Sequence, residues 1–385
     1  MGSRCLNGAE LRGCGSVEVV VGLETVLLAL GSLIDPAATW GQQACVSDLA
    51  HFLTMPGLTG TKPHLVLLRE DGGGRLRGAV MLVEYRALLV GSRVFMTLDW
   101  RGSRNVFGPV EERAGIAADA AAALIERGAR FVSIEFKLHG PEAAPDEFPT
   151  LRTSLEQAFK ANLVLSGKKH RVEWAVERRR KQFDLPLKPT YEETLGHIHQ
   201  RTRANLRYYR RMAVRDLGGR FVHAVTIGEP EFLQLNSTSK YAVNERLARW
   251  RYRTAGRLAN GFLCGLQAAD GRWLSLVAGR RNGDQVEIDW QMNREDLPRY
   301  SLSTAMRSFL LEYAVAHGAT SLLVEGGTAQ PIRTSFRYGN VYNLAVRRNG
   351  LLVRLAAWIA HALFPKRRFA IGLAGGKREW RNAGT

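Results

Sequence analysis

The amino-acid sequence predicts an α/β protein of the α+β kind, with two tandem domains that each contain a mixed, mostly antiparallel sheet flanked by helices. Residues 285–327 carry most of this prediction, because they read as strand, polar loop, amphipathic helix and strand. Residues 99–136 have the same order. Turn signals between apolar runs precede both stretches and predict antiparallel hairpins.

The helix of the later stretch is predicted from apolar residues that recur at helical spacing. They are Leu302, Ala305, Met306, Phe309, Leu310, Tyr313 and Ala314. Ser301 or Ser303 can cap the start of this helix, and Gly318 ends it. The short apolar run 320–325 that follows is typical of a buried parallel strand.

The two stretches share their spacing as well as their order. Asp99-Trp100 is followed after 29 residues by Gly128-Ala129, and Asp289-Trp290 is followed after the same 29 by Gly318-Ala319. We therefore interpret them as two copies of one α/β unit. The predicted helices lie at 112–127 and 302–317, and the predicted hairpin turns lie at 71–74, 270–271 and 282–283.

The composition limits the classes of protein to which the chain can belong. Its 385 residues, 45% of them hydrophobic, are enough for two ordinary cores. The sequence contains no run of about 18 apolar residues, so no membrane-spanning helix is predicted. The start of the sequence lacks the apolar region of a signal peptide. The four cysteines have no CxxC spacing and no HExxH motif occurs. We therefore expect a cytoplasmic protein without a metal site.

The net charge of +18 is concentrated in two segments. Residues 168–220 hold 15 basic and 6 acidic side chains, and residues 347–381 hold 9 basic and 1 acidic. Such clusters attract phosphates, acidic carrier proteins or anionic membrane surfaces; a solvated, arginine-rich surface is the alternative. The predicted division is an N-terminal domain at 1–167, a basic connector strand and helix at 168–220, a C-terminal catalytic domain at 221–346 and a basic tail at 347–385.

The connector is predicted to hold a helix that begins at Thr190, where Glu193 completes a capping box, and ends at Gly218. Its candidate acceptor- or anion-binding residues are Arg203, Arg207, Arg210 and Arg211. In the tail, 351–364 is a predicted amphipathic helix, too short to span a membrane. This helix either packs on the protein or lies on an anionic membrane surface.

The loop before the later helix is a candidate anion site. A helix that opens from a loop at a strand end presents free backbone N–H groups, which bind phosphate. The predicted co-substrate-binding residues are Arg299, Tyr300, Ser301, Leu302, Ser303, Thr304 and Arg333. A phosphate-bearing ligand at this place favours a transferase.

Two motifs resemble the GNAT acyltransferase superfamily, and most of all its BioF-like and CelD-like acetyltransferase branch, which is related to the FemAB aminoacyltransferases. The connector sequence RANLRYYRR at 203–211 fits the R-x-x-L-R-R-x-x-R helix of that branch except at Tyr208. The second signature reads YSLST at 300–304, then Gly318-Ala319, then IRTSF at 332–336 and Tyr338-Gly339. A serine or threonine stands where the branch has glycine before the helix, and Arg333 stands where it has lysine.

The resemblance covers residues 60–345 and implies a doubled GNAT fold in which an acyl donor and an amine acceptor meet in the C-terminal copy. The strict R/Q-x-x-G-x-G/A pyrophosphate loop of simple GNAT enzymes is absent from the sequence. The donor therefore stays open among acyl-CoA or acetyl-CoA, an acyl-carrier protein and aminoacyl-tRNA.

Acyl transfer to an amine needs a route for the ammonium proton and donors for the oxyanion. Glu325, at the end of the second strand, can remove the proton or orient the acceptor, or it can only anchor the turn that follows. Asp289 can bind the acceptor amine, or face solvent together with Glu287. The alternation of the strand predicts that both carboxylates lie on the face opposite Ile288 and Trp290.

The sequence therefore predicts an N-acyltransferase that moves an acetyl or longer acyl group to an amine or sugar-derived acceptor, with Tyr338 as a candidate proton donor to the leaving thiolate. Two alternatives stay open. One is a tRNA-dependent aminoacyltransferase of the FemAB type, in which the connector holds tRNA. The other is a non-catalytic GNAT-like protein that binds nucleic acid or another anionic polymer. Expected partners are a small-molecule or glycan acceptor, an acidic carrier protein or tRNA at the connector, and an anionic membrane at the tail.

Overall fold

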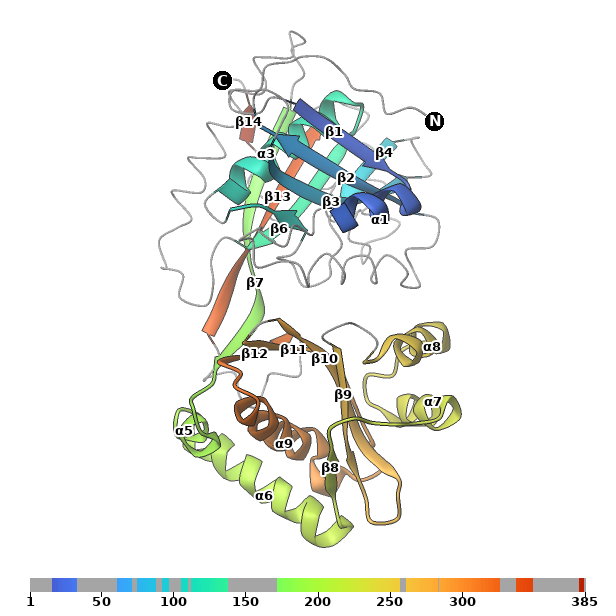
Figure 1. The fold of residues 1–385 in the computed structure, drawn as a ribbon, viewed down its shortest axis with the longest axis vertical. Coiled ribbons are helices and arrows are strands. Elements are labelled where there is room, and N and C mark those ends of the chain that lie inside the picture. Colours follow the sequence, from blue (N-terminus) through green and yellow to red (C-terminus); the bar gives the residue numbers. More distant parts are fainter. Residues whose placement is uncertain are drawn as a thin grey trace. The chain divides into compact units, whose positions relative to one another are not determined.

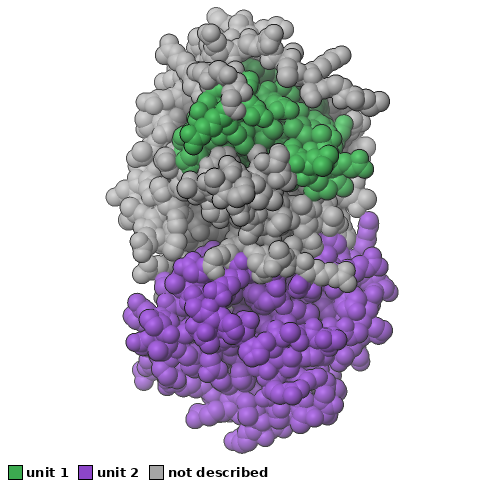
Figure 2. All heavy atoms as spheres, viewed as in Figure 1, with its two compact units in different colours: residues 1–46, 60–181, 339–385 green, residues 47–59, 182–338 purple. Residues whose placement is uncertain are grey.

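The computed structural model, drawn in Figure 1, describes residues 16–32, 61–70, 75–87, 92–96, 105–109, 112–137, 172–256, 261–282, 284–325, 337–348 and 381–383. The chain divides into two compact units (Figure 2). Unit 1 comprises residues 1–46, 60–181 and 339–385, and unit 2 comprises residues 47–59 and 182–338. Each unit is therefore assembled from segments that are not consecutive in the sequence.

Unit 1 contains a mixed sheet with the strand order β1-β2-β3-β4-β6-β13-β7. Its strands are β1 (Ser16–Val21), β2 (Lys62–Arg69), β3 (Leu76–Ala87), β4 (Ser92–Met96), β6 (Phe131–Lys137), β7 (Val172–Pro186) and β13 (Arg337–Arg348). The pairs β1–β2, β2–β3, β3–β4 and β6–β13 are antiparallel, and β4–β6 is parallel. The short strands β5 (Val106–Phe107) and β14 (Arg381–Ala383) pair with β3 and β7.

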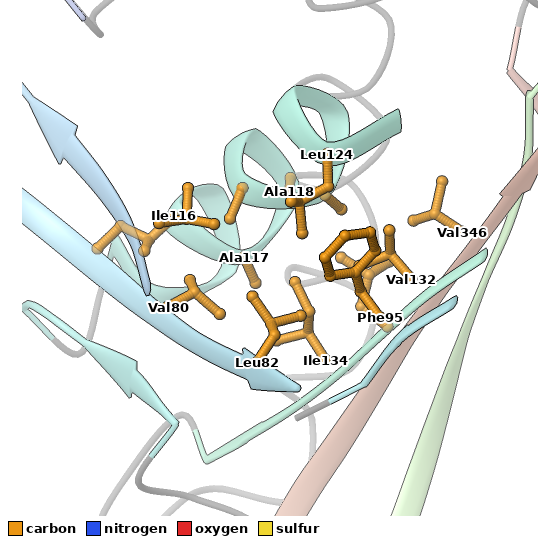
Figure 3. Close-up of a cluster of buried hydrophobic side chains, with 14 of the residues drawn as sticks. Val80, Leu82, Phe95, Ile116, Ala117, Ala118, Leu124, Val132, Ile134 and Val346 are labelled. Carbon is orange, nitrogen blue, oxygen red and sulfur yellow. The ribbon is translucent and has the colours of Figure 1, made fainter. Parts of the chain in front are cut away.

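The core of unit 1 lies between this sheet and helix α3 (Arg113–Glu126). Figure 3 shows Ile116, Ala117 and Leu124 of α3 pointing toward strand residues such as Val80 and Ile134. Alanine favours the helix, and its small side chain lets the helix axis approach the sheet. The remaining helix described in this unit, α1 (Leu23–Ser32), packs against β1 and β2.

Unit 2 contains a second mixed sheet with the order β7-β12-β11-β10-β9-β8. Its strands besides β7 are β8 (Arg220–Val222), β9 (Gly261–Gln267), β10 (Trp273–Asn282), β11 (Gln285–Asn293) and β12 (Ser321–Glu325). Only β11–β12 is parallel among the pairs described in this unit. Its helices are α5 (Tyr191–Gly196), α6 (Gln200–Leu217), α7 (Glu229–Thr238), α8 (Glu245–Thr254) and α9 (Leu302–Ala316).

Helices cover both faces of the sheet in unit 2, with α5, α6 and α9 on one face and α7 and α8 on the other (Figure 1). The first face holds a large apolar core that includes Ile288 of β11 together with Met306 and Leu310 of α9. The second face holds a smaller core that includes Phe232 and Trp290. Both faces of β11 therefore pack against buried apolar residues.

The predicted fold class and the internal repeat are confirmed by this topology. In unit 1 the strands β2, β3 and β4 form an antiparallel meander, and β6 returns through α3 to lie parallel to β4. In unit 2 the strands β9, β10 and β11 form the same meander, and β12 returns through α9 to lie parallel to β11. Each copy is thus a meander followed by a helix and a parallel strand.

The strand next to each copy comes from the other half of the sequence. Residues 182–186 of β7, which follow the first copy in the chain, pair with β12 of the second copy. Residues 341–347 of β13, which follow the second copy, pair with β6 of the first. The predicted division into four consecutive segments does not contain this exchange, since β13 begins inside the predicted C-terminal domain and pairs in unit 1.

The predicted helix of the connector is present as two helices. Thr190 caps α5, because its hydroxyl accepts a hydrogen bond from the backbone N–H of Glu193, whose carboxylate in turn accepts from the N–H of Thr190. The chain then turns at 197–199 before α6, which ends at Gly218 in the left-handed conformation with φ 60°. The predicted tail helix at 351–364 lies outside the described residues. Among the helices described, none has the length and apolar character needed to cross a membrane.

Candidate functional site

Among the described residues, the parallel pairing of β11 with β12 ends before β11 does. Their register runs from Gln285 opposite Ser321 to Ile288 opposite Val324. Beyond Ile288 the strand β11 continues to Asn293 while it pairs only with β10 in the described sheet. The carboxyl ends of parallel strands are the usual place for a ligand in such a sheet. The place where this pairing ends is therefore the first candidate site, and we call it the opening between β11 and β12.

A β-bulge in β11 lies where the two strands separate. Ile288 is opposite Gly279 of β10, Trp290 is opposite Ala278, and Asp289 between them is the additional residue. A bulge of this kind changes which face the following side chains occupy. Ile288 belongs to the core under α9, whereas Trp290 belongs to the core under α7 and α8.

The bulge makes one prediction from the sequence wrong. Simple alternation placed Ile288 and Trp290 on one face, with Glu287 and Asp289 on the other. Glu287 does not face solvent, since its side chain is 1% exposed and forms an ion pair of 2.9 Å with the buried Arg280. Asp289 is half-buried at the bulge, which keeps it at the opening as a candidate contact for an acceptor.

The amino terminus of α9 lies at the same end of the sheet. Ser301, the N-cap residue, has the left-handed conformation with φ 40°, and its side chain makes no capping hydrogen bond. The Ser301 hydroxyl is instead 2.9 Å from the hydroxyl of Thr304. Because the first backbone N–H groups of a helix have no partner inside the helix, the amides of Leu302 and Ser303 are available to an anion.

Gln291 joins the end of β11 to this helix terminus. Its side-chain amide donates to the backbone carbonyl of Ser303 at 3.4 Å and to the side-chain oxygen of Asn293 at 2.9 Å. Ser275 of β10 donates to the same oxygen at 2.8 Å. The bulge is the reason that Gln291 faces α9. The sequence did not identify this residue, because in regular alternation it would lie on the opposite face.

The predicted co-substrate-binding residues divide into three groups. Ser301, Leu302, Ser303 and Thr304 form the amino terminus of α9, as predicted. Tyr300 ends the short helix η2 (Pro298–Tyr300) and packs on the main core of unit 2. Arg299 has a side chain that is 72% exposed and lies 3.8 Å from Asp216 of α6. Arg333 lies outside the described residues.

The predicted catalytic residues other than Asp289 are described only through their backbone. Glu325 is the last residue of β12 and is opposite Gln182 of β7. Tyr338 is the second residue of β13 and ends unit 2. Their roles therefore stay predictions.

Two of the four candidate arginines of α6 form ion pairs within unit 2. Arg210 forms an ion pair of 2.6 Å with Glu312 of α9, and its guanidinium lies 4.4 Å from the centre of the Phe309 ring. Arg207 pairs with Glu192 of α5. Arg211 is exposed and Arg203 is half-buried. Arg210 thus has a structural role in holding α6 on α9, whereas Arg203 and Arg211 remain candidates for an anionic partner.

A further arginine near the site was not identified from the sequence. Arg307 lies in the second turn of α9 and is 6% exposed. Burial lowers the pKa of its guanidinium to about 10. A polar residue within the apolar run of a helix was the available signal. Within the described ranges, no three or more His, Cys, Asp or Glu side chains gather as metal ligands would.

Comparison with known proteins supports the fold. No family model matches the chain, and no curated protein matches its sequence. The structure resembles that of FemX at 11% identity, with 79% of this chain and 95% of FemX covered and a TM-score of 0.51. It is also similar to a tandem GNAT protein from the clavulanic acid biosynthesis pathway (15% identity, 87% and 99% covered, TM-score 0.44) and to L-PGS from Bacillus licheniformis (12%, 79% and 87%, TM-score 0.43).

At such identities a likeness concerns the fold alone, and of these three only FemX has a TM-score above 0.5. Together with the repeated meander, helix and parallel strand, it shows that the chain shares the fold of FemX and contains two tandem copies of one α/β unit, as predicted.

Proposed function

We propose that the chain is an acyltransferase that transfers an acyl group from a thioester donor, acyl-CoA or acetyl-CoA, to an amine acceptor. The observation that supports this most is the position of the α9 amino terminus. Its uncapped first turn lies at the carboxyl ends of two parallel strands whose described pairing ends at Ile288. A phosphate-bearing donor and a second substrate can therefore meet at one edge of the sheet.

The residues present fit a phosphate group on the donor. The amides of Leu302 and Ser303 are hydrogen-bond donors at the positive end of a helix dipole. The N-cap residue Ser301 has the left-handed conformation, and its side chain makes no capping hydrogen bond to them. In this proposal the amides hold the phosphate, and the thioester extends toward the opening between β11 and β12.

The chemistry at the opening requires a neutral amine. The amine nitrogen forms a bond to the acyl carbon, the carbon–sulfur bond breaks, and the thiolate takes up a proton. Asp289 at the bulge and Glu325 at the end of β12 are the proposed acceptors of the ammonium proton, and Tyr338 is the proposed proton donor to the thiolate. The acceptor is proposed to be a small molecule or a glycan amine.

A tRNA-dependent aminoacyltransferase is the second candidate. The likeness to FemX in fold and the exposed Arg211 on α6 favour it. An aminoacyl-tRNA would bring its phosphates to α6, and its binding would weaken steeply with salt. A donor that is a small thioester would bind with a much weaker dependence on salt.

Titration with CoA and acetyl-CoA, followed by the shift in melting temperature, tests the first candidate. The variant S303D places a carboxylate in the first turn of α9, where it stabilises the helix and repels phosphate. We expect it to weaken CoA binding at least tenfold. The control S237D has the same charge change at an exposed position of α7, and it is expected to bind CoA as the wild type does.

Release of free thiol from a panel of acyl-CoA compounds with amines then tests transfer. If the protein does not bind CoA but binds aminoacyl-tRNA with a strong dependence on salt, the CoA-dependent acyltransferase is refuted and the tRNA-dependent aminoacyltransferase is supported.

A further inference from the structure

The side chain of Arg307 is buried without a partner in the part of the chain that the structure describes. It is 6% exposed, and none of the ion pairs or hydrogen bonds among these residues includes it. Burial is the sole cause of its lowered pKa, with no carboxylate that raises it again. A buried charge without a counter-charge strongly destabilises a protein. An anionic ligand can supply the missing counter-charge.

The position of Arg307 in α9 directs its side chain to the opening. Residues four apart lie on the same face of a helix, so Arg307 shares a face with Ser303. The carbonyl of Ser303 accepts a hydrogen bond from Gln291 of β11, and α9 packs against β11 and β10. Helical side chains lean toward the amino terminus. The guanidinium therefore extends along the contact between α9 and the end of β11.

We infer that Arg307 binds a carboxylate of the acceptor, so that the substrate class is an amine that also carries a carboxylate. This inference rests on the proposed function and names the acceptor for the same site. A guanidinium binds a carboxylate through two parallel hydrogen bonds and neutralises one charge. The proposed function assigns the donor phosphate to the backbone amides of Leu302 and Ser303 at the amino terminus of α9, one turn before Arg307. In this inference Asp289, at the bulge on the facing strand, receives the ammonium group of the same molecule.

The test compares matched pairs of acceptors that differ only in the carboxylate. The probes are β-alanine and β-alaninamide, and glutamine and glutamine α-amide, each added without a donor. In the wild type we expect the carboxylate member of at least one pair to raise the melting temperature and its amide to leave it unchanged. The variant R307M is expected to lose this response, and R307K is expected to retain a weaker one.

The melting temperature without ligand gives a second readout. If burial of the unpaired charge destabilises the protein, R307M melts at least about 2 °C higher than the wild type. The control R253M removes an exposed arginine of α8, on the other face of the sheet, and is expected to change neither the stability nor the response to carboxylates.

Three results would overturn the inference. The first is a wild type that responds equally to acid and amide, and the second is an R307M variant that keeps the carboxylate response. The third is a response to inorganic phosphate alone that R307M abolishes, which would assign Arg307 to the donor. These measurements contain no CoA. If CoA does not bind, the proposed donor is refuted, but the inferred carboxylate site at Arg307 is not.

Discussion

Replacing Gly279 by alanine tests whether the bulge in the β10–β11 ladder depends on close approach of the two backbones. A Cβ atom at Gly279 would lie 2.0 Å from the carbonyl oxygen of Glu287 and 2.6 Å from Cζ of Phe262. Separations below 3.0 Å are essentially absent from real structures, so the Cβ and the oxygen must move apart by at least 1.0 Å. The oxygen belongs to the backbone, which cannot move away by a change of rotamer.

The cost of this movement follows from the packing around it. Insertion of one methyl group into a packed interior costs about 1–3 kcal/mol, and a ladder hydrogen bond that is broken adds about 1 kcal/mol. We therefore expect G279A to destabilise unit 2 by roughly 3 kcal/mol, near the upper end of the first range. Because the bulge determines that Gln291 faces α9, CoA binding is expected to weaken by more than the loss of stability explains.

Urea unfolding and hydrogen exchange of the β10 and β11 amides measure these effects. The midpoint is expected to fall while the slope with urea is unchanged. The control G196A lies at the end of α5, where a Cβ meets no atom within 4 Å, and alanine there is expected to stabilise by about 0.5–1 kcal/mol. If G279A unfolded at the same urea concentration as the wild type, with normal exchange in β10, the reasoning would be refuted.

Three further predictions concern the rest of unit 2. T190A removes the capping box of α5 and is expected to lower the free energy of unfolding by about 1 kcal/mol. An unchanged urea midpoint would show that the cap does not stabilise the protein. R210A loses the contacts with Glu312 and Phe309, and we expect it to lower the free energy of unfolding by about 1 kcal/mol without changing the affinity for CoA. Weaker CoA binding at equal stability would instead indicate that Arg210 binds the anion. Burial raises the pKa of Cys264 to about 12, against about 8.5 in an unfolded chain. Above pH 8.5 the unfolded thiol loses its proton while the folded one keeps it, so stability falls as pH rises. The difference between the melting temperatures of wild type and C264A is expected to change between pH 8 and pH 10, and a constant difference would show that the thiol does not contribute.

The sequence was sufficient for the parts of the site that depend on local structure. The helical spacing of Leu302, Met306 and Phe309 predicts α9, and the glycine at 318 predicts its end. The start of α9 at Leu302 follows from the same pattern, so the sequence located the helix terminus at which we propose that an anion binds. The capping box at Thr190 involves residues three apart, and the structure contains it as predicted.

The parts that the sequence could not predict depend on residues that are distant in the chain. Val286, Ile288, Trp290 and Met292 alternate without interruption, which indicates one apolar face. Helices bury both faces of β11, so an apolar side chain is acceptable on either, and the alternation gives no sign of the bulge at Asp289.

What the sequence alone determined, therefore, is the repeated unit, its helices and the turn that begins α9, since each results from contacts between near neighbours in the chain. Only the tertiary structure decided that β7 and β13 exchange partners between the two copies, that Gln291 faces α9, and that Arg307 is buried. Strand pairing and burial are set by the packing of distant segments, and the hydrophobic pattern of a single strand is compatible with more than one partner.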